Sequence, residues 1–450
     1  MKRLITLAIM VAFILGGFGV AQAIEFKAKG DWQIGVMGVS NPNFDSDRHD
    51  DEFQATQRVR TTFEFIANEN LKGVMRVHSG DRTWGADDIS REDGSFEYDQ
   101  AYLDFMIPNS PVNMKVGKQP FSTPHALGSP IFDNTIWGIT AASPITDEFG
   151  LTLGWLRQDA TLGEDEANKN DEVDYFYAST PITMDGFDVN PYFVYGMAGS
   201  DAGDSVAHAA GTQRDIETSE SSQAYWAGLN FSVNMFDPIV VKGDVIYGRQ
   251  GSTDIADNKV GAETRGWFAA LAAQYNMDYM TPEVFVLYET GHGKDYADDH
   301  SEKGKVMPSF NGGGGDLYGV STFAMSGSPL RGIGRAALNE YAGISAWGAS
   351  GKMAVGGKLG DMSFIDDVTH DLQLTYYQGT NHKDLRGEGY FTTKDNAWEV
   401  TFDTQYQMYE NLAAILELGY LHPSLSSTNR DDGPEDDSSF KAATGLRYMF

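Results

Sequence analysis

Apolar and polar side chains alternate along many segments of about ten residues, which is the pattern of β-strands with one apolar face. In the segment 26–37, Phe26 and Trp32 share one face, and Lys27 and Asp31 share the other. The same alternation appears in 369–378, 397–408 and 412–420. Few segments show a helical period. The pattern therefore predicts an all-β chain.

Short and long connections alternate between these segments. The short turns are Asn68–Leu71, Asn109–Val112, Pro144–Glu148, Thr183–Gly186, Asn234–Pro238, Asn276–Pro282, Gly360–Asp367 and Tyr409–Asn411. The long, mostly polar loops are 39–54, 79–96, 118–134, 158–171, 198–221, 249–261, 291–351, 379–395 and 422–438. Transmembrane antiparallel β-barrels have short periplasmic turns and long extracellular loops. The alternation predicts such a barrel with about 18 strands, and 16 strands is the alternative count.

The N-terminus has the pattern of a secretory signal peptide. Lys2 and Arg3 precede an apolar run, and Ala21-Gln22-Ala23 forms a small-residue cleavage site. We expect residues 1–23 to be removed. No Pro- or Ser-rich linker divides residues 24–450, so we expect a single barrel domain there.

Composition narrows the class further. The chain has no cysteine, which leaves neither disulfides nor thiolate metal ligands. Its formal net charge of −31 argues against nucleic acid as a partner. No segment after the signal peptide is long and apolar enough for a membrane helix. An exported chain of this kind is either a soluble β-protein or a membrane barrel.

The last strand, 439–450, ends on a bare aromatic residue. If it closes the barrel against 26–37, its apolar face meets lipid and the membrane interface. That face consists of Leu446, Tyr448 and Phe450. Other aromatic residues near strand ends fit the same interfacial girdles: Trp155, Tyr175, Tyr195, Trp267 and Tyr288. We expect apolar residues outside the barrel and polar residues inside.

Two stretches resemble the homotrimeric porins of Gram-negative outer membranes. They are QRVRTTFEFIANENLKGVMRV (57–77) and YDQAYLDFMIPNSPVNMKVGKQPF (98–121). That family has similar hairpins, with an arginine-bearing second strand and an "AYL…VGRQ"-like pair before the third outer loop. The resemblance implies a trimer in the outer membrane, in contact with lipid and lipopolysaccharide. It also implies that the third loop, 119–133, folds inward and narrows the lumen.

The same resemblance suggests which side chains line the constriction. Lys118 stands where the family has the arginine of "GRQ", and a β-bulge at Gly117 is needed to turn it inward. Asp133 is the third loop's only acid. Alternation also directs several cations of the second, third and fifth strands to the lumen: Arg58, Arg60, Lys72, Arg76, His78 and Lys115. These cations either select solutes by charge or are ordinary polar residues paired with Glu64 and Asp104.

Loops offer weaker signals. The longest, 291–351, contains His292, His300, GGGGD (312–316), Arg331 and Arg335. It could cap the pore, line it, or form a short helix near 333–341. The acidic runs 45–52, 298–302 and 431–437 are either solvated surface or diffuse Ca²⁺ or Mg²⁺ sites. We expect no dedicated metal site.

The sequence therefore favours a passive, water-filled porin for small hydrophilic solutes and ions. No catalytic motif is present, so we expect neither an enzyme nor a cofactor. A channel selective for a sugar, carboxylate or oxyanion is the main alternative. The more remote alternatives are a secreted β-protein that binds glycans or calcium, and an outer-membrane hydrolase.

Overall fold

The computed structural model describes residues 24–44, 51–84, 97–160, 172–199, 207–208, 222–251, 263–294, 296, 303–310, 323, 329–330, 351–386, 390–426 and 437–450. The expected signal peptide lies outside these ranges. The strands are β1 (Glu25–Ser40), β2 (Glu52–Asn68), β3 (Leu71–Thr83), β4 (Glu97–Met106), β5 (Asn113–Ser122), β6 (Asp133–Pro144), β7 (Gly150–Ala160), β8 (Glu172–Ser179), β9 (Ile182–Met184), β10 (Phe187–Ala198), β11 (Ala207–His208), β12 (Ser222–Phe236), β13 (Ile239–Gln250), β14 (Thr264–Tyr275), β15 (Thr281–Glu289), β16 (Ser309–Phe310), β17 (Lys352–Ile365), β18 (Val368–Gly379), β19 (Asn396–Tyr409), β20 (Leu412–Ser424) and β21 (Ser439–Met449). A single 3-10 turn, η3 (Lys383–Leu385), is the helical element of this part of the chain.

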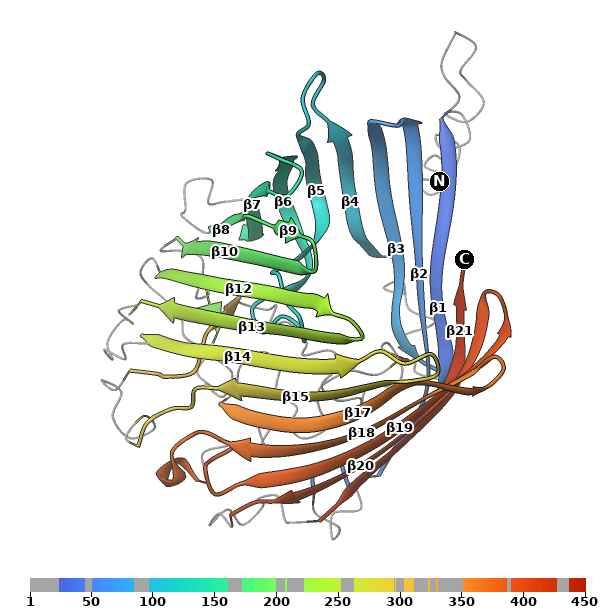
Figure 1. Ribbon diagram of the computed structural model, residues 1–450, viewed down its shortest axis with the longest axis vertical. Coiled ribbons are helices and arrows are strands. Elements are labelled where there is room, and N and C mark those ends of the chain that lie inside the picture. Colours follow the sequence, from blue (N-terminus) through green and yellow to red (C-terminus); the bar gives the residue numbers. More distant parts are fainter. Residues whose placement is uncertain are drawn as a thin grey trace, which may run out of the picture.

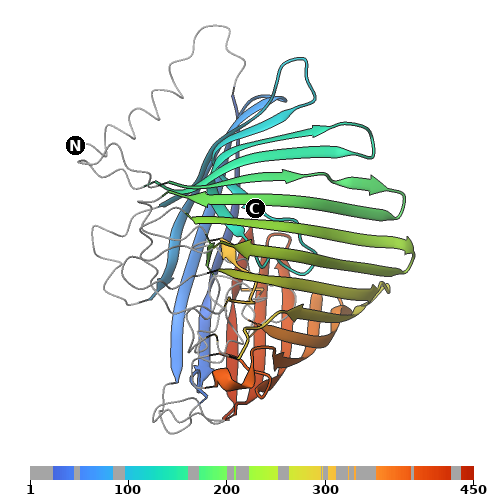
Figure 2. The same ribbon diagram turned by 90° about the vertical axis from the view of Figure 1, so that its left-hand side faces the viewer.

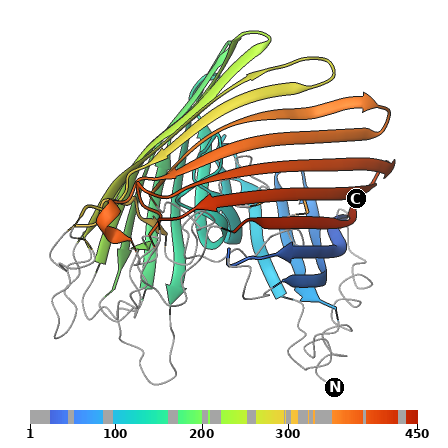
Figure 3. The ribbon, with the colours of Figure 1, turned by 90° about the horizontal axis from the view of Figure 1, so that it is seen from below.

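The long strands form one closed antiparallel sheet. Each pairs with its neighbours in sequence, and β21 returns to pair with β1, so the sheet has no free edge (Figures 1 and 3). The short strand β9 and strand β8 both pair with β10, so they share one position in the wall. The barrel therefore has 18 strands, as the alternation of turns and loops predicted.

All eight predicted short turns join neighbouring strands, and Figure 2 shows those between the green and yellow strands along one rim. Several boundaries of these turns differ by one or two residues, and the boundary at Gly360 differs most. Strand β17 does not stop at Gly360 but continues to Ile365, so only Asp366 and Asp367 form the turn. Two register shifts, beyond Leu359 and beyond Met362, break the simple alternation there and hide the strand from a sequence reading.

The closing strand has the predicted orientation. Tyr448 and Phe450 lie on the outer face, each about two-fifths exposed, and both contact the ring of Trp32 on β1. The backbone of Phe450 exchanges two hydrogen bonds with Gly30. A Cβ at Gly30 would overlap the Phe450 ring, so the ring lies directly over this glycine. The terminal phenylalanine is thus part of the barrel wall.

The inner face is not uniformly polar, which departs from the sequence prediction. Along β7–β15 the inward side chains form a buried apolar cluster that includes Leu156, Trp226 and Phe268. Tyr175, expected in an outer girdle, belongs to this cluster and is fully buried. Strand β8 carries aromatic residues on both faces, because two chain segments inside the barrel cover its inner face.

Candidate functional site

The first inserted segment is the third loop, residues 123–132, named L3 here. Its shape is fixed from within: Thr123 and Ser129 join through their hydroxyls, and the Ser129 Oγ accepts from the backbone N–H groups of Ile131 (3.3 Å) and Phe132 (3.2 Å). Gly128 has a φ of 103°, a conformation that glycine adopts without strain. Because Ile131 and Phe132 are buried in the apolar cluster, L3 lies inside the barrel, as expected.

A carboxylate on the wall holds the tip of L3. Asp244, at an inward position of β13, accepts from the N–H of Ala126 at 2.9 Å and 2.8 Å through its two oxygens, and from the N–H of Leu127 at 3.2 Å. The side-chain amide of Asn230 donates to the same carboxylate at 3.1 Å. Charged hydrogen bonds of this kind are stronger than neutral ones. Asp244 therefore fixes L3 across the barrel interior.

His125 lies beside this anchor. Its Nε2 is 3.4 Å from the Ser122 hydroxyl, and burial lowers the pKa of His125 although Asp244 and Asp133 act in the opposite direction. The imidazole is therefore mainly neutral at pH 7, and L3 adds little positive charge to the lumen. Asp133, the predicted acid of L3, is the first residue of β6 and acts electrostatically on His125.

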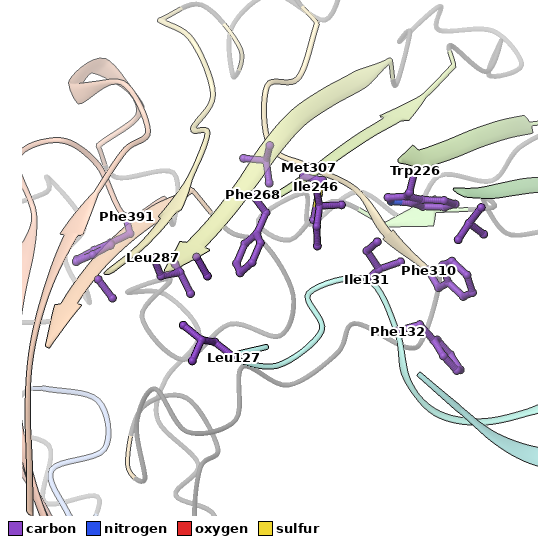
Figure 4. Close-up of a cluster of buried hydrophobic side chains, with 14 of the residues drawn as sticks. Leu127, Ile131, Phe132, Trp226, Ile246, Phe268, Leu287, Met307, Phe310 and Phe391 are labelled. Carbon is purple, nitrogen blue, oxygen red and sulfur yellow. The ribbon is translucent and has the colours of Figure 1, made fainter. Parts of the chain in front are cut away.

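The second inserted segment is 303–310, part of the long loop between β15 and β17. Its backbone is held by Thr264, whose hydroxyl donates to the Val306 carbonyl at 2.6 Å, and by Trp226, whose indole donates to the Pro308 carbonyl at 2.6 Å. The Phe310 ring stacks on Tyr175 at 3.7 Å between centroids. Figure 4 shows Phe310 beside the L3 residues Ile131 and Phe132, and Met307 next to Ile246 of the wall. The two inserted segments form a shared apolar core against the wall.

Two more wall carboxylates bind the long loop. Glu399 on β19 accepts from the N–H of Phe323 at 3.2 Å, and Glu417 on β20 accepts from the N–H of Leu330 at 2.7 Å. Phe323 and Leu330 of the long loop therefore lie against the inner face of the barrel wall. The glycine run 312–316, His300, Arg331, Arg335 and the helix expected near 333–341 lie outside the described residues.

The predicted cations of β2 and β3 face the lumen, and acids accompany them. Arg76 makes a two-pronged contact with Asp99, with Nε 2.7 Å and 2.8 Å from its oxygens, while the Nε of Arg60 is 3.9 Å from Asp99. Arg58 also points inward and is largely buried. Asp99 was missed because it sits at a register shift between β3 and β4 that moves it to the inner face.

Lys72 and Lys115 lie further toward the short-turn end of the same wall. The Nζ of Lys72 is 3.9 Å from Glu64 and 3.7 Å from Asp104. Lys115 on β5 lies directly opposite Asp104 on β4. The predicted pairing with Glu64 and Asp104 is therefore present at Lys72. Side chains on this wall remain partly exposed, about a third in Lys72, so the space beside them is not filled by protein.

The prediction for Lys118 was wrong. Strand β5 pairs with β4 and β6 without a shift, so no bulge exists at Gly117 although its φ is 127°. Lys118 lies opposite Ala101 and Trp137 on the outer face, and its Nζ is 3.5 Å from the Tyr98 carbonyl. A long amine next to exposed aromatic residues is typical of a membrane interface.

A second group of lumen-facing acids lies on β13–β20 rather than on L3. Inward acids of β13–β20 outnumber inward lysines there; they are Asp244, Glu283, Glu289, Asp371, Glu399, Asp403 and Glu417. Asp403 stands directly opposite both Asp371 and Glu417. The lumen wall at β13–β20 is therefore net acidic, whereas the wall at β1–β5 carries cations and acids side by side.

Neither a protein-family model nor a curated protein sequence matches the chain. Several solved structures have the same fold. OccK11 (OpdR) of Pseudomonas aeruginosa is 10% identical over 94% of this chain and 96% of that chain, with a TM-score of 0.55. OccK8 (OprE) of the same organism is 11% identical over 95% and 98%, with a TM-score of 0.53. OpdL, also of Pseudomonas aeruginosa, is 11% identical over 95% and 99%, with a TM-score of 0.53.

These likenesses establish the class of fold: a closed antiparallel barrel of 18 strands of the porin type. Within the described ranges, no helix is long and apolar enough to cross a membrane. No group of three His, Asp or Glu side chains there is placed to hold a metal ion. The acidic runs that could bind Ca²⁺ or Mg²⁺ diffusely fall largely outside those ranges.

Proposed function

We propose that this protein is an outer-membrane channel through which small hydrophilic solutes and ions diffuse passively. The observation that carries the proposal is the fixed position of L3. Asp244 holds it inside the barrel on one side, while charged side chains such as Lys72 stay partly exposed on the other. A narrowed lumen with a solvated polar wall is the form of an aqueous pore. Diffusion through it needs neither catalysis nor a cofactor.

Swelling of proteoliposomes tests this function. Vesicles that contain the folded protein should swell in sugars of increasing size at rates that fall with size, since the lumen sets a size limit. Vesicles without protein are the control. Folded protein that admits no small sugar and no salt would refute the channel.

A channel selective for a small carboxylate or oxyanion is the second candidate. The lumen-facing cations of β1–β5 support it, because cations that line a pore attract anions. They include Arg58, Arg60, Arg76 and Lys115. A selective channel should show a current or flux that saturates with one anion. A general pore should not.

We also propose that the protein is a homotrimer and that it is exported to the outer membrane. Residues 1–23, acting as a signal peptide, would direct the chain across the inner membrane and then be removed. Ala269 and Ala273 face outward on β14, and such small residues allow a second barrel to approach. Cross-linking of unheated, detergent-extracted protein should give a species of three chains.

A further inference from the structure

Two arginines face each other on the outside of the barrel. Arg249 on β13 and Arg265 on β14 are directly opposite in the strand register. Their strand neighbours Gln250 and Thr264 point inward and are buried, so both guanidinium groups are on the outer face. Like charges placed directly opposite destabilise a sheet unless an anion lies between them.

The nearby acid does not balance this charge. Glu263 is 3.1 Å from Arg249, but it is also 2.5 Å from Lys303, whose hydrogen bond is the main reason that the pKa of Glu263 lies below its usual range. Two cations thus share the carboxylate of Glu263. Among the described residues, no acid lies within ion-pair distance of Arg265, which is exposed.

The height of the pair fits the lipid headgroups. On the outer face of β14, Tyr275 and Trp267 bound an apolar stretch that contains Leu271, all about half exposed. Trp267 packs against Tyr247 at 4.9 Å, which forms an aromatic girdle at the long-loop end. Arg265 is the next outward residue, about 7 Å further along the strand. It therefore lies where headgroup phosphates begin.

We propose that Arg249 and Arg265 bind a phosphate monoester of an anionic lipid in the outer leaflet, such as the phosphorylated sugar of lipopolysaccharide. The inference rests on the outer-membrane location proposed above but not on transport. Two guanidinium groups about 5 Å apart at Cβ can each make paired hydrogen bonds to one phosphate. A phosphate dianion also offsets the surplus of positive charge.

Other outward cations lack this arrangement. Arg157 is neutralised by Asp174 through two contacts of 2.7 Å. Lys118 stands opposite Trp137 rather than a second cation. Lys118 therefore provides a matched control, since it lies near the same interface with no second cation opposite it.

Native mass spectrometry of the folded, detergent-extracted protein tests the site. The probes are bisphosphorylated lipid A and the same lipid without phosphates. The double variant R249Q/R265Q should retain the phosphorylated lipid about tenfold less than the unchanged protein, which corresponds to the loss of one or two charge-assisted bonds. The variant K118Q should retain the phosphorylated lipid as well as the unchanged protein does. The lipid without phosphates should be retained equally by all three proteins.

Equal retention by R249Q/R265Q, or equal loss in K118Q, would overturn the assignment. Displacement of the lipid by millimolar inorganic phosphate would mean a free-anion site instead. Folding is checked on gels: the difference in mobility between heated and unheated samples should be the same for each variant as for the unchanged protein. A different value would reveal a folding defect. Because the pair is outside the lumen, the single-channel current of R249Q/R265Q should be unchanged, and failure of this site would leave the proposed channel intact.

Discussion

The backbone N–H of Ala126 donates to the carboxylate of Asp244 across the inside of the barrel, at 2.9 Å and 2.8 Å from its two oxygens. This contact joins positions 118 residues apart in the chain. It ties the tip of L3 to one wall carboxylate, whose charge is the simplest feature to change.

Replacement of Asp244 should loosen L3. The change Asp244→Ala removes the charged acceptor of two backbone N–H groups, those of Ala126 and Leu127, a loss on the order of 3 kcal/mol in loop anchoring. We expect larger sugars to enter proteoliposomes and the single-channel current to become noisier. Asp244→Asn, which keeps one acceptor oxygen, should have a smaller effect.

Glu283→Gln is the matched control for this prediction, since Glu283 also faces inward but pairs with Lys242 at 2.8 Å rather than with L3. If Asp244→Ala leaves the size limit unchanged, the narrowing does not depend on this anchor.

Barrel closure should depend on the space above Gly30. An alanine at this position would push the Phe450 ring out of its contacts with Trp32, which are worth about 1–2 kcal/mol. We expect Gly30→Ala to lower the urea midpoint of unfolding in lipid vesicles. Gly38→Ala, on the same strand and face, should be neutral because its nearest neighbour would be 3.9 Å away. Equal effects of the two changes would contradict the account.

Ion preference should respond to Asp99. This carboxylate lies against both Arg76 and Arg60, so Asp99→Asn leaves the two guanidinium groups uncompensated in the lumen. The permeability ratio of anion to cation, taken from the reversal potential in a salt gradient, should rise about twofold. Arg76→Gln should shift it the other way. Lys118→Gln should not change it, and a shift as large as that of Arg76→Gln would place Lys118 in the pore.

The outer loop should open in acid. Burial, with the charge of Lys305, lowers the pKa of His292 from 6.5 to about 3. The opened chain therefore binds more protons between these values, and the stability of the closed loop falls as the pH drops through this window, by at most about 5 kcal/mol. The protection of the amides of 291–294 against hydrogen exchange, taken relative to the intrinsic rate at each pH, should fall from pH 6.5 to pH 4.

His292→Gln supplies the comparison for the acid effect, because glutamine can still accept from the Lys305 N–H, as the His292 Nδ1 does at 3.2 Å, but does not titrate. In this variant, the protection of the same amides relative to the intrinsic exchange rate should not change with pH. If His292→Gln loses protection in acid as much as the unchanged protein does, a group other than His292 causes the opening.

Much of the barrel could be predicted from the sequence because its wall obeys a two-residue period. The alternation in β1 gives the outward face of Trp32, and the same period explains the lumen position of Arg58 and Arg60. The prediction of which side chains face inward failed where a strand departs from that period or where the inner face is apolar. Asp99 lies at a register shift, and Tyr175 faces inward because L3 and 303–310 cover it.

The inserted segments could not be predicted in detail because loops have no period. The contact of Ala126 with Asp244 depends on how the barrel folds over 118 intervening positions. One signal was present: Asp244 interrupts the apolar run VVKGDVIYG at an inward position two residues from Lys242. A buried acid in such a run requires donors from elsewhere, and L3 supplies them.

Single-channel recording in a planar bilayer, with detergent-extracted and unheated protein under a salt gradient, tests the central claim most directly. The account predicts stepwise, ohmic current, in groups of three steps if the protein is a trimer, with a reversal potential that moves when Asp99 or Arg76 is replaced. Correctly folded protein that inserts but carries no current would contradict the open channel.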